Sequence, residues 1–155
     1  MFAILIAAFY GNALGNGFVF EDLSEIEHNE YLHSLSNIHK VVTGCPREFI
    51  DGGCRGATFP HYRPTNYLSF FLTYQISSRP WVFHLVNLLY FFAASSLLYI
   101  FVKLLTKRAV CAFLAGTLFV IHPVNSEVVN WISAVPDLIN LNFILLSCIF
   151  YIRYR

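Results

Sequence analysis

The sequence predicts an all-α, polytopic membrane protein with about four transmembrane helices and a long extracytoplasmic first loop that carries short interfacial helices. Of its 155 residues, 57% are hydrophobic and only 12% are charged, whereas a soluble domain carries about 25% charged residues. The charged residues are also segregated, so that four long uncharged runs remain. This composition excludes a water-soluble globule and a disordered chain. A net charge of +1 argues against a nucleic-acid partner.

The four uncharged runs locate the predicted helices. A helix rises about 1.5 Å per residue, so about 20 residues cross a hydrocarbon core of about 30 Å. A cleaved signal peptide is the alternative for the first run, but such peptides open with Lys or Arg, and this one opens Met-Phe-Ala-Ile-Leu. We therefore expect a transmembrane helix at 1–20, an extracytoplasmic loop with interfacial helices at 21–80, and transmembrane helices 2–4 within 81–155. The uncharged runs span residues 1–20, 81–102, 109–126 and 138–152.

The distribution of charge predicts the topology. All nine acidic residues lie between residues 21 and 51 or at Glu127 and Asp137, in connections on one side of a four-pass chain, together with five basic residues, which gives −4. The other side carries +5 and no acidic residue. By the positive-inside rule, both termini are cytoplasmic and the long loop is extracytoplasmic. The five residues of the positive side are Lys103, Lys107, Arg108, Arg153 and Arg155.

The long loop contains two patterns. Residues 21–43 have a loose helical periodicity, which predicts one or two short helices. Further on, Tyr67, Phe70, Phe71 and Tyr74 follow the spacing i, i+3, i+4 and i+7. This aromatic stripe fits a helix lying in the membrane interface, or one packed against the transmembrane helices. The spacing does not decide between the two.

The cysteines fall into two pairs. Two lie inside predicted helices and are expected to be small hydrophobic residues. Cys45 and Cys54 share the extracytoplasmic loop, where an oxidising compartment permits a disulfide. A metal site that adds His39 or His61 is the alternative, although eight intervening residues exceed the short spacing of zinc modules.

Two adjacent carboxylates follow the first apolar run. Glu21 and Asp22 repel each other unless a proton, a cation or a polar substrate relieves them, so the pair suits a general base or a divalent metal ion that holds a phosphate. The simpler interpretation is that they mark the end of a helix in water. Glu25 and Glu27 lie further into the loop and are expected to be ordinary surface charges.

A second polar segment closes the third apolar run. Pro123 breaks the helix, so we expect the following turn to run along the membrane surface with His122, Glu127 and Trp131 within reach of one another. Ionisable groups near a membrane core are functional candidates. An interfacial anchor built on Trp131 is the alternative.

Several segments in order carry a family resemblance. They are Asn-Ala-Leu-Gly-Asn-Gly-Phe-Val-Phe-Glu-Asp at 12–22, Tyr-Arg-Pro at 62–64, Phe-His-Leu-Val-Asn at 83–87, His-Pro-Val-Asn-Ser-Glu at 122–127, Trp-Ile at 131–132 and Asp-Leu at 137–138. Together they resemble the amino-terminal membrane part of the transmembrane and tetratricopeptide-repeat O-mannosyltransferases and their bacterial relatives. Those proteins in turn resemble C-type (GT-C) glycosyltransferases.

The resemblance implies transfer of a sugar from a polyprenyl-phosphate donor to a Ser or Thr hydroxyl on the extracytoplasmic face. It implies that Glu21 and Asp22 are the catalytic pair, with Asp22 the better candidate for the base that deprotonates the acceptor. It also implies that Arg63 faces the donor phosphate, a role suited to a planar guanidinium. His122 and Glu127 would line the same donor pocket.

The chain also departs from the family pattern. Family members usually have two Asp at the positions of Glu21 and Asp22, and commonly an Arg at the position of Val135. They have many more transmembrane helices and a tail of repeats, and no repeat of that period occurs here. Three interpretations follow: the front of a longer enzyme, a split relative that works with other membrane subunits, or a non-catalytic accessory subunit of a larger membrane complex.

Overall fold

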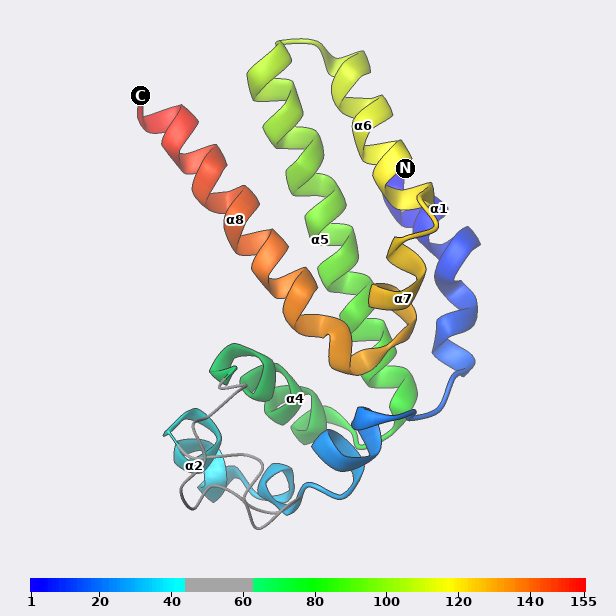
Figure 1. Ribbon diagram of the computed structural model, residues 1–155, viewed down its shortest axis with the longest axis vertical. Coiled ribbons are helices and arrows are strands. Elements are labelled where there is room, and N and C mark those ends of the chain that lie inside the picture. Colours follow the sequence, from blue (N-terminus) through cyan, green and yellow to red (C-terminus); the bar gives the residue numbers. More distant parts are fainter. Residues whose placement is uncertain (44–62) are drawn as a thin grey trace.

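The computed structural model describes residues 1–43 and 63–155, and in these two stretches the chain is helical without strands (Figure 1). This confirms the predicted all-α class. The elements in chain order are α1 (Phe2–Tyr10), η1 (Gly11–Gly15), η2 (Leu23–Glu27), η3 (Glu30–His33), η4 (Leu35–Asn37), α2 (Ile38–Thr43), α4 (Pro64–Ile76), α5 (Pro80–Thr106), α6 (Ala109–Ile121), α7 (Asn125–Asn130), η5 (Ile132–Ala134) and α8 (Val135–Tyr154).

Two helical segments, Pro80–Thr106 and Ile132–Tyr154, are long and apolar enough to cross a membrane. They contain α5 and α8, and both of these helices begin with a proline in the first turn, where the missing N–H costs no helical hydrogen bond. Figure 1 shows α5 and α8 close together near α4 and diverging toward the C-terminus. Where the two helices lie close together, the Asn142 amide of α8 donates a hydrogen bond to the Tyr90 carbonyl of α5 at 3.0 Å.

The other two predicted spans are shorter than expected. The first apolar run forms α1 and then the tighter turn η1, and the third ends as α6 at Ile121. Gly11 and Gly15 weaken the first helix, and Pro123 cannot continue the other. With 13 residues, α6 is about 20 Å long, which is short of a bilayer core of about 30 Å.

The aromatic stripe of α4 packs inside the molecule. Tyr67, Phe70 and Phe71 are buried and Tyr74 is partly buried against the same cluster. The cluster joins α4 to the first turns of α5 and α8, so the packed alternative is confirmed for this stripe. Its other buried members are Ile26, Leu32, Val41, Phe83, Ile132, Val135 and Ile139.

A second buried cluster holds α1 and α6 against α5. Tyr10 and Phe91 meet edge to face, and the Tyr10 hydroxyl donates to the Val120 carbonyl at 3.0 Å. The ring of Phe2 covers Gly116 on α6. The absence of a side chain at Gly116 is therefore what lets α1 approach α6 closely.

Residues 21–43 form more and shorter elements than the one or two helices predicted. A π-helical turn, two 3-10 turns and α2 follow one another. Cys45, Cys54 and His61, which carry the disulfide and metal-site predictions, lie outside the described residues. Cys111 and Cys148 are free and half-buried, as expected for small apolar residues in a helical core.

Candidate functional site

Asp22 is a fully buried carboxylate with three hydrogen-bond donors. Its Oδ1 accepts from the Ser133 backbone N–H at 2.8 Å and from the Ser133 hydroxyl at 2.6 Å. Its Oδ2 accepts from the Val19 N–H at 3.1 Å. Donors of this kind satisfy a buried carboxylate. Asp22 therefore ties the segment after η1 to η5, just before α8.

Glu21 is exposed and lines cavities, unlike its neighbour. The chain turns sharply before it, because Phe20 adopts a positive φ of 50°, which is uncommon for a residue with a side chain. With Asp22 turned inward toward Ser133, the Glu21 carboxylate is left on the outside. It lies where two cavities adjoin.

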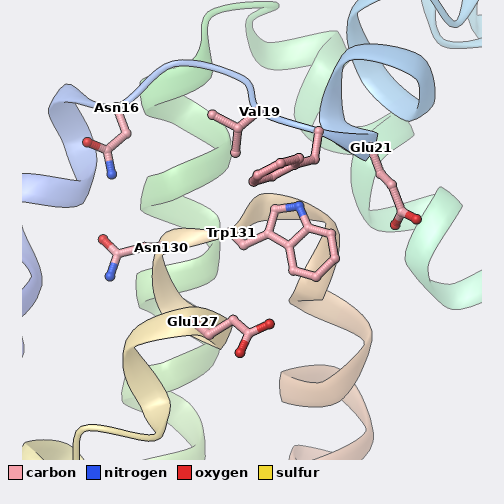
Figure 2. A pocket seen from close by; sticks show the side chains of 7 residues that line it. Asn16, Val19, Glu21, Glu127, Asn130 and Trp131 are labelled. Carbon is pink, nitrogen blue, oxygen red and sulfur yellow. The ribbon is translucent and has the colours of Figure 1, made fainter.

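The larger cavity has a volume of about 610 Å³ and is mostly apolar. Figure 2 shows the Trp131 indole between the side chains of Glu21 and Glu127 in this view. The structure thus brings Glu127 and Trp131 together with Glu21. The remaining lining residues are Asn16, Val19, Phe20 and Asn130.

The smaller cavity, of about 300 Å³, is polar and shares Glu21 and Trp131 with the larger one. Among the residues that the structure describes, its charged lining consists of one cation, Arg63, and the three carboxylates of Glu21, Glu25 and Asp137. Arg63 is exposed and directly precedes α4. The sequence-predicted partners Glu21 and Arg63 therefore line one cavity.

Glu25 is not the ordinary surface charge that the sequence predicts. It is almost fully buried and accepts a hydrogen bond from the Tyr67 hydroxyl at 3.3 Å. The π-helical turn η2 directs Glu25 toward α4. Glu27, two residues on, is exposed as expected.

His122 lies outside both cavities. It is exposed, and its Nδ1 accepts a hydrogen bond from the Val124 N–H at 3.2 Å. The break at Pro123 occurs as predicted, but the turn places Glu127 and Trp131 at the cavity without His122.

Sequence reasoning missed two buried polar residues, Ser133 in the lining of the smaller cavity and His84 on α5. Ser133 donates two hydrogen bonds to Asp22. In the sequence, Ser133 is distinguished only as a hydroxyl residue shortly before a helix that begins with a proline in its first turn. His84 is fully buried on α5 beside the segment Asn16–Gly17 and Asp22. His84 lies within the Phe-His-Leu-Val-Asn segment, so the resemblance marked its position but assigned it no role.

A divalent metal ion does not fit the acidic pair well. Both oxygens of Asp22 already face N–H or O–H donors, whereas a metal ion requires free lone pairs. Among residues 1–43 and 63–155, no group of three His, Cys, Asp or Glu side chains is placed to hold a metal ion. Glu21 alone would supply too few ligands.

The fold and cavities define a helical protein with two candidate membrane spans and a carboxylate-rich site beside the N-terminal end of α8. The chain belongs to the family of TMTC protein O-mannosyl-transferases. It is 29% identical to the human protein O-mannosyl-transferase TMTC3 over 156 residues, which cover 97% of this chain and 16% of that protein. It is 33% identical to Drosophila melanogaster Tmtc2 over 154 residues, which cover 94% of this chain and 16% of that protein.

Human TMTC2 is 38% identical over 94 residues, covering 60% of this chain and 11% of that protein. The chain thus spans about one sixth of the length of the relatives that match it throughout. No protein-family model matches the chain, and no solved structure matches it.

Proposed function

We propose that this chain forms part of a membrane protein O-glycosyltransferase, which moves a mannose-type sugar from a polyprenyl-phosphate donor to a Ser or Thr hydroxyl. The observation that carries the proposal is the position of Glu21, exposed at the junction of two cavities, with Arg63 in one and Glu127 in the other. The relatives are named for O-mannosyl transfer, which supports the choice of reaction.

Glu21 is the carboxylate that we assign to the acceptor, in place of Asp22. A general base must come within hydrogen-bond reach of the hydroxyl that it deprotonates. Asp22 is enclosed and already accepts three hydrogen bonds, so it acts as a positioning residue that fixes the direction of Glu21. Glu21 has access to both cavities.

Arg63 is the donor-binding residue in this proposal. A planar guanidinium pairs well with phosphate oxygens, and Arg63 is the one cation lining the described part of the smaller cavity. The carboxylates of Asp137 and Glu25 would accept hydrogen bonds from sugar hydroxyls. Glu127 and Trp131 would border the acceptor in the larger cavity.

Sugar transfer in this proposal is a nucleophilic displacement at the anomeric carbon. The acceptor oxygen forms a bond to that carbon while its proton passes to Glu21. The bond from the anomeric carbon to the phosphate oxygen breaks, and its electron pair leaves on the polyprenyl phosphate beside Arg63. Holding the reactants in this geometry supplies much of the acceleration.

The same proposal places the chain in the membrane. Two long helices and the two shorter apolar segments form the membrane part, with both termini cytoplasmic and the connection from 21 to 80 outside. The site then faces the extracytoplasmic side, where secreted acceptors are exposed. The acidic surplus of that side and the positive-inside rule support this orientation.

The test measures transfer of labelled mannose from polyprenyl-phosphate mannose to a Ser/Thr peptide by membranes that contain the full chain. Loss of a general base costs about 10²–10⁴ in rate, so Glu21→Gln is expected to lower transfer by that order. Glu27→Gln is the matched control, because Glu27 is exposed and lines neither cavity. Arg63→Gln is expected to raise the donor concentration required for half-maximal transfer.

Equal transfer by the wild type, Glu21→Gln and Glu27→Gln proteins would contradict the assignment of Glu21. Absence of both transfer and donor binding in the wild type would favour an accessory subunit. The exposed apolar side chains along α5, α6 and α8 would then serve contacts with other membrane subunits.

A further inference from the structure

A third cavity lies at the opposite end of the molecule from Glu21. It has a volume of about 440 Å³ and lies between the C-terminal ends of α5 and α8, where Figure 1 shows these helices diverging. Its lining is half basic and half apolar or aromatic. The six residues are Tyr99, Ile100, Lys103, Leu104, Lys107 and Arg153.

The three cations lack acidic partners among the residues that the structure describes. Neither α5 nor α6 contains an acidic residue, and the one on α8 is Asp137. Asp137 precedes Arg153 by 16 positions, or about 24 Å along the helix. Three like charges around one cavity repel one another, which an anion would relieve.

The cavity lies at the level of a membrane surface. The uncharged run 81–102 of α5 would span about 33 Å, so Lys103 follows where the hydrocarbon core ends. Arg153 likewise follows the uncharged run 138–152 on α8. Tyr99 lies one turn below, and Lys103 Nζ rests 5.7 Å from its ring centroid, an arrangement typical of the interface.

We propose that this cavity binds the phosphate headgroup of an anionic phospholipid from the adjoining leaflet. Lys103, Lys107 and Arg153 would contact the phosphate, because basic pockets between transmembrane helices suit such headgroups. Ile100 and Leu104 would contact the first part of an acyl chain. The two helices diverge here, and the lipid fills the opening between them.

This site is separate from the sugar-transfer site and does not rest on the proposed function. It involves the other ends of α5 and α8, and none of its six residues lines the cavities at Glu21. Loss of lipid binding with transfer unchanged, or the reverse, would therefore distinguish the two proposals.

A substitution at Lys107 can remove a positive charge from the cavity without destabilising the fold. Lys107 is the C-cap of α5 with φ 57° in the left-handed region, which is unfavourable for a residue with a side chain. Glycine adopts this conformation freely. Lys107→Gly therefore removes a cation from the cavity while favouring the fold, so that loss of binding would not reflect unfolding.

The experiment is native mass spectrometry of the full chain in a neutral detergent, titrated with dioleoyl phosphatidic acid or dioleoyl phosphatidylcholine. Each cation near an anionic surface contributes about a fivefold factor. We expect Lys103→Gln, Lys107→Gly and Arg153→Gln each to weaken phosphatidic acid binding about fivefold. Arg108→Gln is the matched control, because Arg108 is an exposed cation beside Lys107 that does not line the cavity.

Three results would overturn the proposal. Equal affinities for phosphatidylcholine and phosphatidic acid would show that the anionic headgroup is irrelevant and would contradict the site. An effect of Arg108→Gln as large as that of Lys107→Gly would indicate general attraction by surface charge. Displacement of the lipid by an equal concentration of glycerol 3-phosphate would indicate a site for a free anion.

Discussion

Asp22 and Glu21 are adjacent in sequence, and their environments are opposite. Asp22 is enclosed by Ser133 and Val19, whereas Glu21 borders two cavities. A buried carboxylate with charge-assisted hydrogen bonds stabilises the fold only while all its donors remain. The two residues should therefore respond differently to loss of charge.

The free energy of unfolding should depend on Asp22 and its partner Ser133 and hardly on Glu21. Asp22→Asn and Ser133→Ala are both expected to lower the free energy of unfolding, by about 1.5–3 kcal/mol for a hydrogen bond to a charged group. Glu21→Gln should leave stability nearly unchanged, because that side chain is exposed. Thermal unfolding in detergent measures each variant.

Ser147→Ala is the control for Ser133→Ala. The Ser147 hydroxyl donates a hydrogen bond to the Phe143 carbonyl of its own helix, and the side chain is exposed. A loss of stability in Ser147→Ala equal to that in Ser133→Ala would show that the contact to Asp22 is not what stabilises this region.

At the scale of elements, the packing of α4 against its neighbours depends on its buried aromatic side chains. Phe71 is fully buried between α4 and its neighbours, whereas the next residue, Leu72, is 53% exposed. Phe71→Ala is expected to cost about 3–5 kcal/mol, and Leu72→Ala much less. Chemical denaturation in detergent, followed by circular dichroism, measures both, and similar costs would contradict the packed position of α4.

The contact between α1 and α6 supports a third prediction. A Cβ at Gly116 would lie 2.5 Å from Cζ of Phe2, so Gly116→Leu overpacks the contact and is expected to cost about 1–3 kcal/mol. The double variant Phe2→Ala, Gly116→Leu should recover most of that loss, because contacting residues are not additive. Additive effects in thermal unfolding would argue against the contact.

At the scale of the whole molecule, the segregation of charge predicts orientation. In a variant without native cysteines, a membrane-impermeant maleimide applied to intact cells should label Ser78→Cys and leave Arg108→Cys unlabelled. Both positions are exposed, and they lie at opposite ends of α5. Permeabilised cells, in which both should react, provide the control, and labelling of Arg108→Cys in intact cells would reverse the topology.

The sequence by itself determined the properties that depend on composition and local pattern. Low charge and long apolar runs established a helical membrane protein, Pro123 located the end of α6, and the order of motifs indicated the family. Each follows from the hydrophobic effect or from backbone sterics over a few neighbouring residues.

Tertiary structure alone decided which polar groups are enclosed and which are free. Asp22 is buried because it meets Ser133, 111 positions away in the chain, and Glu25 is buried because it meets Tyr67, 42 positions away. The burial of the aromatic stripe of α4 likewise depends on residues that are distant in the sequence, on α5, η5 and α8. No local pattern encodes these contacts, since the burial of a side chain depends on what the rest of the chain brings against it.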